Sequence, residues 1–411
     1  MTRRLGIACI LTAPLGALAL LLLGCAGTLE GRLAALCTLA LVAAVLLALA
    51  RRPKAARCAL AALVLGGVVL LLRAPSGQPA RHASLRAVYL RGGGPARFAP
   101  TNLVPEVDQL VLATFFVWIP DPCMTWGGAA RLRGAIRAAY ADTLHLPEAR
   151  ALGTALGDAL TDRDTGRVFV YEPPHAPLER RPALLFLHGS AGSWKGYFYT
   201  LHELARRRRF ALVQPSFGFG QWSRPEGRVT LERTRAWLAA QPWVDPAQIY
   251  LVCLSNGGRA VTRLLRAETA RYRGVVFVSA VIEPRVLDAG VVDRSWHRVP
   301  MLVLHGADDD RIPVSYLQDG LDALRDQHLT VTPVVFPRED HFLIFTDPTA
   351  VRRALDTWLD AVGSSPLPPR PDGREHLVGV PVHPNPREHP GHPSISTEDE
   401  GGSRQEGPRG G

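Results

Sequence analysis

The chain has 411 residues, a formal net charge of +10 and 47% hydrophobic residues. Its length allows one sizeable domain with additional segments. The positive charge does not indicate a nucleic-acid-binding protein, because no basic stripe alternates with aromatic residues and much of the excess lies beside apolar stretches. The basic residues are almost all arginine, with Lys54 and Lys195 as the lysines, and Ala, Gly and Pro are abundant. This composition is typical of a GC-rich, bacterial genome.

Three apolar stretches near the N-terminus predict transmembrane helices, over residues 5–26, 33–50 and 55–72. Each is close to the ~20 residues that span a bilayer, so residues 1–73 form a membrane region. Cytoplasmic loops are enriched in Arg and Lys. Arg3, Arg4 and the basic loop 51–57 therefore belong inside, and the nearly neutral loop 27–32 belongs outside. The prediction is a multi-pass protein of the cytoplasmic (inner) membrane, with the rest of the chain on the extracytoplasmic side.

An alternative exists for the first span. The sequence Leu22-Leu23-Gly24-Cys25 is similar to a lipobox, at which a signal peptide is removed and the cysteine is lipidated. Both interpretations leave the downstream chain on the same side of the membrane. The six cysteines imply no disulfide framework, and no metal-ligand spacing occurs.

Residues 74–165 carry few clear signals and are interpreted as a linker and an N-terminal extension. Residues 81–100 have the composition of a linker. Residues 107–119 are apolar but too short to span a membrane, so a strand and a segment on the bilayer surface both remain open. Residues 131–160 have the Ala- and Leu-rich spacing of two packing helices. At the other end, residues 364–411 are rich in Pro, Gly, His and charge, which predicts disorder.

Residues 166–363 alternate short apolar runs with helical patterns, which predicts βαβ units and a mostly parallel sheet. The expected strands are residues 167–171, 184–187, 210–214, 250–254, 274–278, 300–306 and 329–336. The expected helices are residues 197–208, 229–240, 257–268, 314–327 and 349–362. The short stretch 283–298 leaves room for a small cap and for no large lid domain.

Three polar side chains follow three of these strands. Ser255 stands in a Ser-Asn-Gly-Gly turn between a strand and a helix, Asp309 lies in the loop after the strand at 300–306, and His341 follows the last strand. Ligands bind at the carboxyl ends of strands in open α/β sheets, so these side chains are expected to meet. Taken singly, each is more often a turn, loop or capping residue. Asp308 and Asp310 remain alternatives to Asp309.

The chain order Ser, Asp, His matches the α/β-hydrolase arrangement and neither the chymotrypsin nor the subtilisin order. Residues 166–362 resemble α/β hydrolases of the esterase, dienelactone hydrolase and polyester depolymerase type. The resemblance implies an α/β-hydrolase fold with helices on both faces of the sheet. It also implies a catalytic triad of Ser255, Asp309 and His341. The motif His188-Gly189-Ser190-Ala191-Gly192 resembles the oxyanion loop of that fold. The implied oxyanion donors are then the N–H groups of Asn256 and of Ser190 or Ala191.

Two positions depart from the pattern of that superfamily. Cys253 replaces the first glycine of Gly-x-Ser-x-Gly, and Asp340 precedes His341 where relatives often have glycine. A nucleophilic role for Cys253 is the alternative to a buried, inert thiol, and the position inside the strand favours the buried thiol. Asp340 is expected either to cap the following turn or to change the titration of His341.

The sequence therefore predicts a membrane-anchored serine hydrolase that cleaves small or polymeric carboxylic esters without a cofactor or a metal. The alternatives are a peptidase similar to prolyl oligopeptidase and a non-catalytic membrane receptor or scaffold with a hydrolase fold. Aromatic residues near the predicted site, from Trp194 to Tyr199 and from Phe217 to Trp222, are divided between a substrate pocket and core packing. The natural substrate and the oligomeric state do not follow from the sequence.

Overall fold

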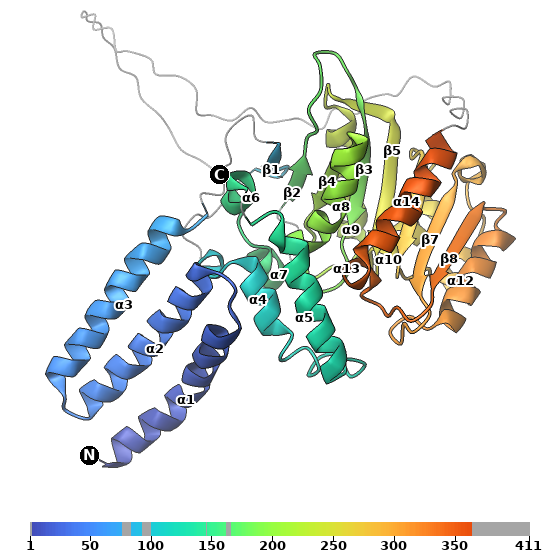
Figure 1. The fold of residues 1–411 in the computed structure, drawn as a ribbon. Coiled ribbons are helices and arrows are strands. Elements are labelled where there is room, and N and C mark those ends of the chain that lie inside the picture. The colour runs from blue at the N-terminus through green and yellow to red at the C-terminus, as the bar shows by residue number, and fades with distance from the viewer. Residues whose placement is uncertain (1, 76–83, 93–99, 145, 162–165, 364–411) are drawn as a thin grey trace, which may run out of the picture. The chain divides into compact units, whose positions relative to one another are not determined.

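The computed structural model describes residues 2–75, 84–92, 100–144, 146–161 and 166–363 (Figure 1). The expected tail of residues 364–411 lies outside these ranges, as do residues 81–83 and 93–99 of the expected linker at 81–100. The described chain contains three long N-terminal helices, an extension of shorter elements, and a domain built on one eight-stranded sheet.

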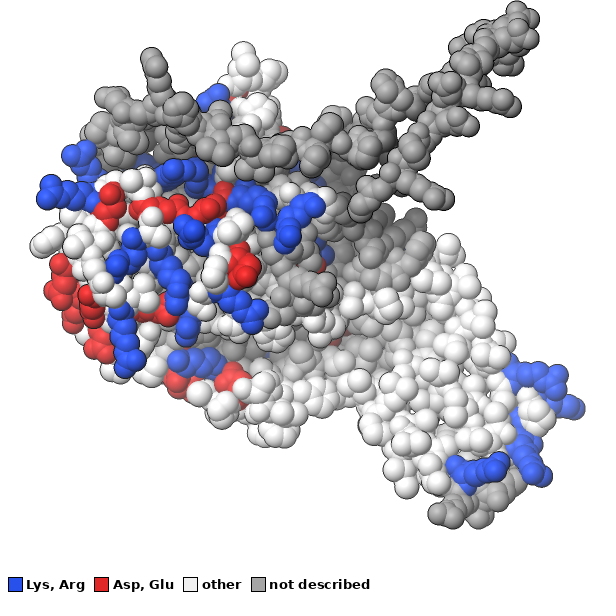
Figure 2. Space-filling model, turned by 180° about the vertical axis from the view of Figure 1, so that it is seen from behind, with Lys and Arg blue, Asp and Glu red and all other residues white. Residues whose placement is uncertain are grey.

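The three N-terminal helices are α1 (Thr2–Cys25), α2 (Leu29–Leu49) and α3 (Pro53–Arg73). Stretches of 22, 21 and 21 residues within them are long and apolar enough to cross a membrane. Basic residues gather at the end of these helices that lies away from the sheet, as Figure 2 shows, and they include Arg4 in the first turn of α1, Arg51 and Arg52 between α2 and α3, and Lys54 in the first turn of α3. Cys25, which the lipobox alternative would lipidate, is buried, and its carbonyl oxygen accepts a hydrogen bond from Arg137.

The extension between the spans and the domain is structured. It holds β1 (Leu85–Tyr89), a 3₁₀ turn (Pro100–Asn102), α4 (Glu106–Ala113), α5 (Trp126–Ala141), α6 (Pro147–Ala151) and α7 (Leu156–Thr161). The expectation of a linker at 81–100 was wrong for residues 85–89, because this short run pairs antiparallel with β2 at the sheet edge. Of the two alternatives for the apolar stretch 107–119, the strand was wrong, because residues 107–113 form most of α4.

The sheet has the order β1-β2-β4-β3-β5-β6-β7-β8. Its strands after β1 are β2 (Arg167–Tyr171), β3 (Arg181–Leu187), β4 (Ala211–Pro215), β5 (Val244–Leu254), β6 (Gly274–Val278), β7 (Met301–Gly306) and β8 (Val331–Phe336). β3 to β8 are parallel, whereas β1 and β2 pair antiparallel with their neighbours. This is an α/β-hydrolase fold, as the sequence predicted, preceded by three candidate membrane helices.

Helices cover both faces of the sheet (Figure 1). The cluster on one face includes side chains of α5, α8 (Lys195–Arg208), α13 (Leu343–Thr346) and α14 (Pro348–Gly363). The cluster on the other face includes α9 (Pro225–Ala239), α10 (Gly257–Ala267) and α12 (Val314–Asp326). Side chains of β5 alternate between the two, with Tyr250 and Val252 in the first and Leu251 and Cys253 in the second, as the pleat of a strand requires. The five expected helices are all present, shifted at their ends by a few residues.

The segment 283–298 is small, as expected. It forms α11 (Pro284–Asp288) and a 3₁₀ turn (Arg294–Arg298), and its Leu287 and Trp296 are fully buried in the core cluster shared with α10 and α12.

A buried carboxylate joins the extension to the sheet domain. Glu106, at the start of α4, accepts hydrogen bonds from the N–H of Lys195 at 2.6 Å and from the N–H of Ala155 at 2.7 Å, and the hydroxyl of Tyr140 donates to it at 2.5 Å. The Lys195 N–H belongs to the first turn of α8, where the helix dipole favours an anion. The extension is therefore part of the same packed body as residues 166–363.

Candidate active site

Ser255 lies at the tip of a sharp turn between β5 and α10. Its φ of +48° is unusual for a residue with a side chain and is the strained geometry of a nucleophile elbow. The turn is held by two backbone hydrogen bonds, from Ser255 N–H to the Val278 carbonyl at 3.2 Å and from Val281 N–H to the Ser255 carbonyl at 3.0 Å. A Cβ on Gly257 would lie 2.7 Å from the Leu187 carbonyl oxygen, and one on Gly258 would collide with the Val281 carbonyl. Both glycines are therefore needed for the close approach of the neighbouring strands.

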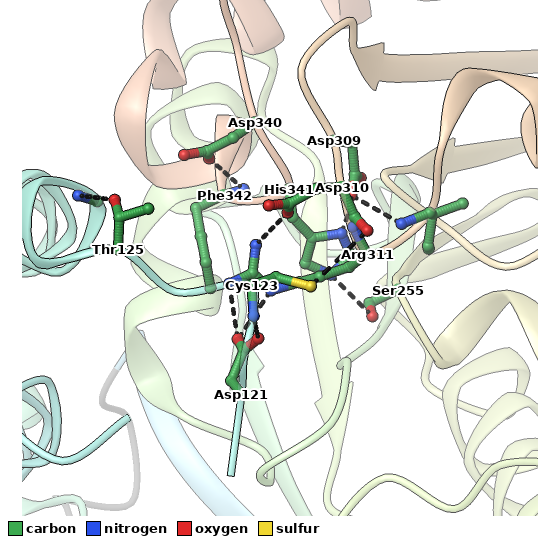
Figure 3. Close-up of polar contacts among 12 residues, drawn as sticks. Asp121, Cys123, Thr125, Ser255, Asp309, Asp310, Arg311, Asp340, His341 and Phe342 are labelled. Carbon is green, nitrogen blue, oxygen red and sulfur yellow. Dashed lines mark hydrogen bonds and ion pairs between the residues drawn. The ribbon is translucent and has the colours of Figure 1, made fainter. Parts of the chain in front are cut away.

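His341 lies in the loop after β8 and contacts both other residues of the predicted triad (Figure 3). Its Nε2 is 3.1 Å from the Ser255 hydroxyl oxygen, and its Nδ1 is 2.8 Å from Asp309 Oδ2. A carboxylate at Nδ1 can only accept, so Nδ1 carries a proton and Nε2 is left to accept the serine proton. The structure brings these three predicted residues together in one hydrogen-bonded chain.

Asp309 is the acid that faces the histidine. Its side chain is buried, and Oδ1 accepts the N–H groups of Arg311 at 3.0 Å and Ile312 at 2.9 Å. Burial alone would raise its pKa, but the hydrogen bond and charge of His341, the Ile312 N–H and nearby His305 together lower the pKa below its usual value. The neighbouring Asp308 and Asp310 are exposed, and the carboxylate of Asp310 pairs with Arg311.

The predicted oxyanion residues lie beside the elbow. The side-chain amide of Asn256 donates to the Ser190 hydroxyl at 2.5 Å, which ties the loop after β3 to the residue that follows Ser255. A Cβ on Gly189 would lie 3.0 Å from that of Ser255, so the two loops are in contact. Ala191 has a φ of +72° and Gly192 one of +113°, which reverses the chain immediately after Ser190. These contacts hold the loop after β3 next to the turn that carries Ser255.

A buried histidine that sequence reasoning left without a role supports this loop. His188 is fully buried, its Nδ1 donates to the Gly189 carbonyl at 2.8 Å, and its Nε2 accepts the Phe217 N–H at 3.1 Å. Burial lowers the pKa of His188 to about 4, so the ring is neutral at pH 7. His188, the first residue of the His-Gly pair that resembles an oxyanion loop, thus has a structural role: its ring holds the loop after β3 against the loop after β4.

The two departures from the superfamily pattern have plain structural explanations. Cys253 has no exposed surface, its thiol donates to the Val276 carbonyl at 3.4 Å, and burial raises its pKa. A buried thiol of raised pKa is a poor nucleophile. Asp340 caps the turn that follows, because its Oδ1 accepts the Phe342 N–H at 2.8 Å, and its Oδ2 is 3.1 Å from Arg131.

The extension also contacts the loop that carries Asp309, and no sequence pattern predicted this contact. Arg311 forms a double hydrogen bond with Asp121, at 2.6 and 2.8 Å, and its guanidinium lies 4.8 Å from the centre of the Phe342 ring (Figure 3). The thiol of Cys123 is 3.8 Å from the Asp310 carbonyl oxygen. Arg311 lies two residues after Asp309 and Phe342 directly follows His341, so residues 121–123 of the extension support the loops of both side chains.

The aromatic residues near the predicted site are mainly core. Trp194, Phe198, Tyr199, Phe217 and Trp222 are buried, and Phe219 is exposed. A cavity of about 340 Å³ lies elsewhere, between the ends of the spans and the extension, and no triad residue lines it. Among the described residues, no group of three or more His, Cys, Asp and Glu side chains is placed to hold a metal ion.

No family model and no curated protein matches the chain. Solved structures of a thermophilic esterase from the planctomycete Thermogutta terrifontis are similar to it in fold. The native form is 18% identical, covers 50% of this chain and 89% of its own, and has a TM-score of 0.39. The butyrate-bound form is 18% identical over 50% of this chain and 91% of its own, with a TM-score of 0.40. The form phosphorylated by paraoxon is 18% identical; the match covers 48% of this chain and 89% of the esterase, with a TM-score of 0.39.

Proposed function

We propose that this chain is a membrane-anchored serine hydrolase that cleaves carboxylic esters through an acyl-enzyme. The observation that carries the proposal is the continuous hydrogen-bonded chain from the Ser255 hydroxyl through His341 to the buried carboxylate of Asp309. A serine hydroxyl needs an adjacent base to become a nucleophile, and that base needs a third group to orient it. All three requirements are met by residues from three different loops at one end of the sheet.

The chemistry follows from the two ring nitrogens of the His341 imidazole. His341 Nε2 takes the Ser255 proton while the serine oxygen attacks the ester carbonyl carbon, and the imidazolium then protonates the departing alcohol. Water enters, gives its proton to Nε2 and attacks the acyl carbon, which releases the acid and restores the serine. Asp309 stays ionised throughout, holds Nδ1–H in place and stabilises the imidazolium.

The negative charge that develops on the carbonyl oxygen needs fixed donors. We assign the backbone N–H of Asn256 and that of Ser190 or Ala191 to this role. Each such donor is worth about 3 kcal/mol of transition-state stabilisation. The Asn256–Ser190 hydrogen bond supports the assignment, because it links the two segments that would supply the donors.

A fluorophosphonate probe tests the proposal, because it reacts with a serine only when a base has activated it. The full chain in detergent micelles is treated with the probe beside Ser255→Ala and the control variant Ser295→Ala, which changes a half-buried serine of the 3₁₀ turn at 294–298. We expect labelling of the wild type and of Ser295→Ala, and none of Ser255→Ala. A folded wild-type protein that is not labelled would contradict the proposal and favour a receptor or scaffold. Turnover of matched ester and amide substrates then separates an esterase from a peptidase.

We also propose that the hydrolase domain lies on the extracytoplasmic side of a bacterial cytoplasmic membrane. The support is the positive charge of the loop between α2 and α3, since basic loops stay inside. A membrane-impermeant maleimide applied to intact cells tests this with Asp360→Cys on the exposed surface of α14 and Arg52→Cys in the basic loop. Labelling above the wild-type background is expected at position 360 alone, and the reverse pattern would place the domain in the cytoplasm.

A further inference from the structure

The loop between α4 and α5 exposes an unusual set of apolar side chains. Within 11 residues, Phe116 is 41% exposed, Trp118 46%, Ile119 65% and Trp126 67%. The rings of Trp118 and Trp126 lie 5.9 Å apart, so these side chains form one patch at the tip of the helix pair. We call Phe116, Trp118, Ile119 and Trp126 the apolar tip. Large contiguous apolar patches on a protein surface generally mark a site of interaction.

The helix that leads to this tip is fastened to the candidate spans. The carboxylate of Asp108, in the first turn of α4, accepts the Gly27 N–H at 2.7 Å, the Thr28 N–H at 3.3 Å and the Thr28 hydroxyl. On α5, Arg137 donates to the carbonyl of Cys25 at 2.9 Å. These contacts fix both helices against the short connection between α1 and α2.

The direction of α4 then follows from the packing of its other end. Leu112, one turn beyond Asp108, packs against a cluster of Leu22, Ala26 and Ala35. Leu22 lies inside the first candidate span and Ala35 inside the second. α4 therefore runs back alongside the last turn of the first candidate span and the first turns of the second, and the chain that continues from Leu112 enters the apolar tip from the level of these span ends. Figure 1 shows α4 and α5 next to the end of α1.

The same loop is joined to the candidate active site. Asp121 follows Ile119 by two residues and forms the double hydrogen bond with Arg311, two residues after the catalytic acid. Cys123 contacts the Asp310 carbonyl. The connection from the loop of the apolar tip to the triad loops is thus short and made of direct contacts (Figure 3).

We propose that the apolar tip lies in the interfacial layer of the bilayer and that the triad acts on acyl esters carried by membrane lipids. Trp and other aromatic side chains are favoured at the membrane–water interface, and burial in lipid removes the exposed apolar surface from water. The leaflet concerned is the one that faces the hydrolase domain. The substrate class rests on the proposed serine hydrolase activity, whereas the position of the tip does not.

The position of the tip is tested by tryptophan fluorescence. The chain has eight tryptophans and the three spans contain none, so quenching by lipids brominated along their acyl chains reports on residues outside the spans. The full chain is placed in vesicles of brominated and of ordinary phosphatidylcholine. We expect quenching of the wild type and of Trp237→Phe, and its loss in the double variant Trp118→Phe with Trp126→Phe. Equal quenching in the double variant and the wild type, or none in the wild type, would overturn the proposal and leave a protein partner as the occupant.

The substrate class is tested with a pair of esters. Trp118→Ser with Ile119→Ser is compared with Val291→Ser, a matched change of an apolar residue that is 83% exposed on another segment. We expect the double variant to hydrolyse a vesicle-borne diacylglycerol ester at least about tenfold more slowly, the effect of one large apolar side chain leaving lipid. A soluble p-nitrophenyl butyrate should be cleaved at an unchanged rate, as should both esters by Val291→Ser. Equal losses on both esters, or no loss on either, would overturn the proposed substrate class. Failure of the wild type to cleave either ester would instead contradict the hydrolase activity, and the quenching result would stand.

Discussion

Replacing Asp309 with Asn probes the orientation of His341 in the proposed triad. Oδ1 of Asp309 accepts the N–H groups of Arg311 and Ile312. An asparagine can keep both of these bonds only with its carbonyl oxygen at that position, which turns its NH₂ group towards Nδ1 of His341. Nδ1 must then accept, the proton moves to Nε2, and Nε2 can no longer take the proton of Ser255.

The loss expected for the wrong tautomer is about 10⁴-fold in kcat, or about 5.5 kcal/mol of barrier. The assay is hydrolysis of p-nitrophenyl butyrate by the full chain in micelles, with circular dichroism to verify the fold. Asp308→Asn and Asp310→Asn are the matched controls, because both side chains are exposed, and they should remain within about twofold of the wild type, as surface substitutions usually do. A rate for Asp309→Asn within tenfold of the wild type would refute the assignment of the acid.

Three further changes test the surroundings of the triad. Cys253→Ala should keep activity within about twofold and cost about 1 kcal/mol of stability; loss of probe labelling would make the thiol a participant. The pKa of His188 is about 4 in the folded chain and about 6.5 unfolded, so the unfolded state binds more protons between these values. Denaturant titrations should show the unfolding free energy falling by about 3 kcal/mol as pH drops from 6.5 to 4, and a slope unchanged in His188→Gln would be inconsistent with this. Glu106→Ala leaves the buried ammonium of Lys195 without its carboxylate and should lower the free energy of unfolding by about 3–5 kcal/mol, seen as a lower melting temperature. Glu106→Gln should cost less, because its carbonyl oxygen can still accept from the Lys195 N–H and the Tyr140 hydroxyl.

The sheet domain was predictable because its signals are local and repeated. Each parallel strand is a short apolar run, each helix has a clear period, and the polar residues after β5, β7 and β8 stand at strand ends that the topology brings together. The choice of Asp309 over its two neighbours rested on the resemblance to the superfamily, because three consecutive acids carry no distinguishing local pattern; in the structure Asp309 is the buried one and bonds to His341.

The extension was poorly predicted for the opposite reason. β1 has five residues at a sheet edge, and α4 has eight, too few for either to establish a period. The contacts that matter most there join residues far apart in the chain, such as Asp121 with Arg311 and Glu106 with Lys195. A contact of this kind produces no recognisable pattern in the sequence around either partner, so it cannot be predicted from a single sequence.

The hydrogen bonds of Asp108 to Gly27 and Thr28 limit how far the sheet domain can move relative to the candidate spans. A domain on a flexible linker can occupy a volume set by the length of that linker, and it meets substrates in many orientations. Here the first structured helix after the spans is bonded directly to the connection between two of them. With α1 to α3 in a bilayer, as we propose, Ser255 would be held at a constant height and orientation above that membrane. Its encounters with membrane-borne esters would be those of a two-dimensional search, governed by how many substrate molecules occupy each unit of membrane area.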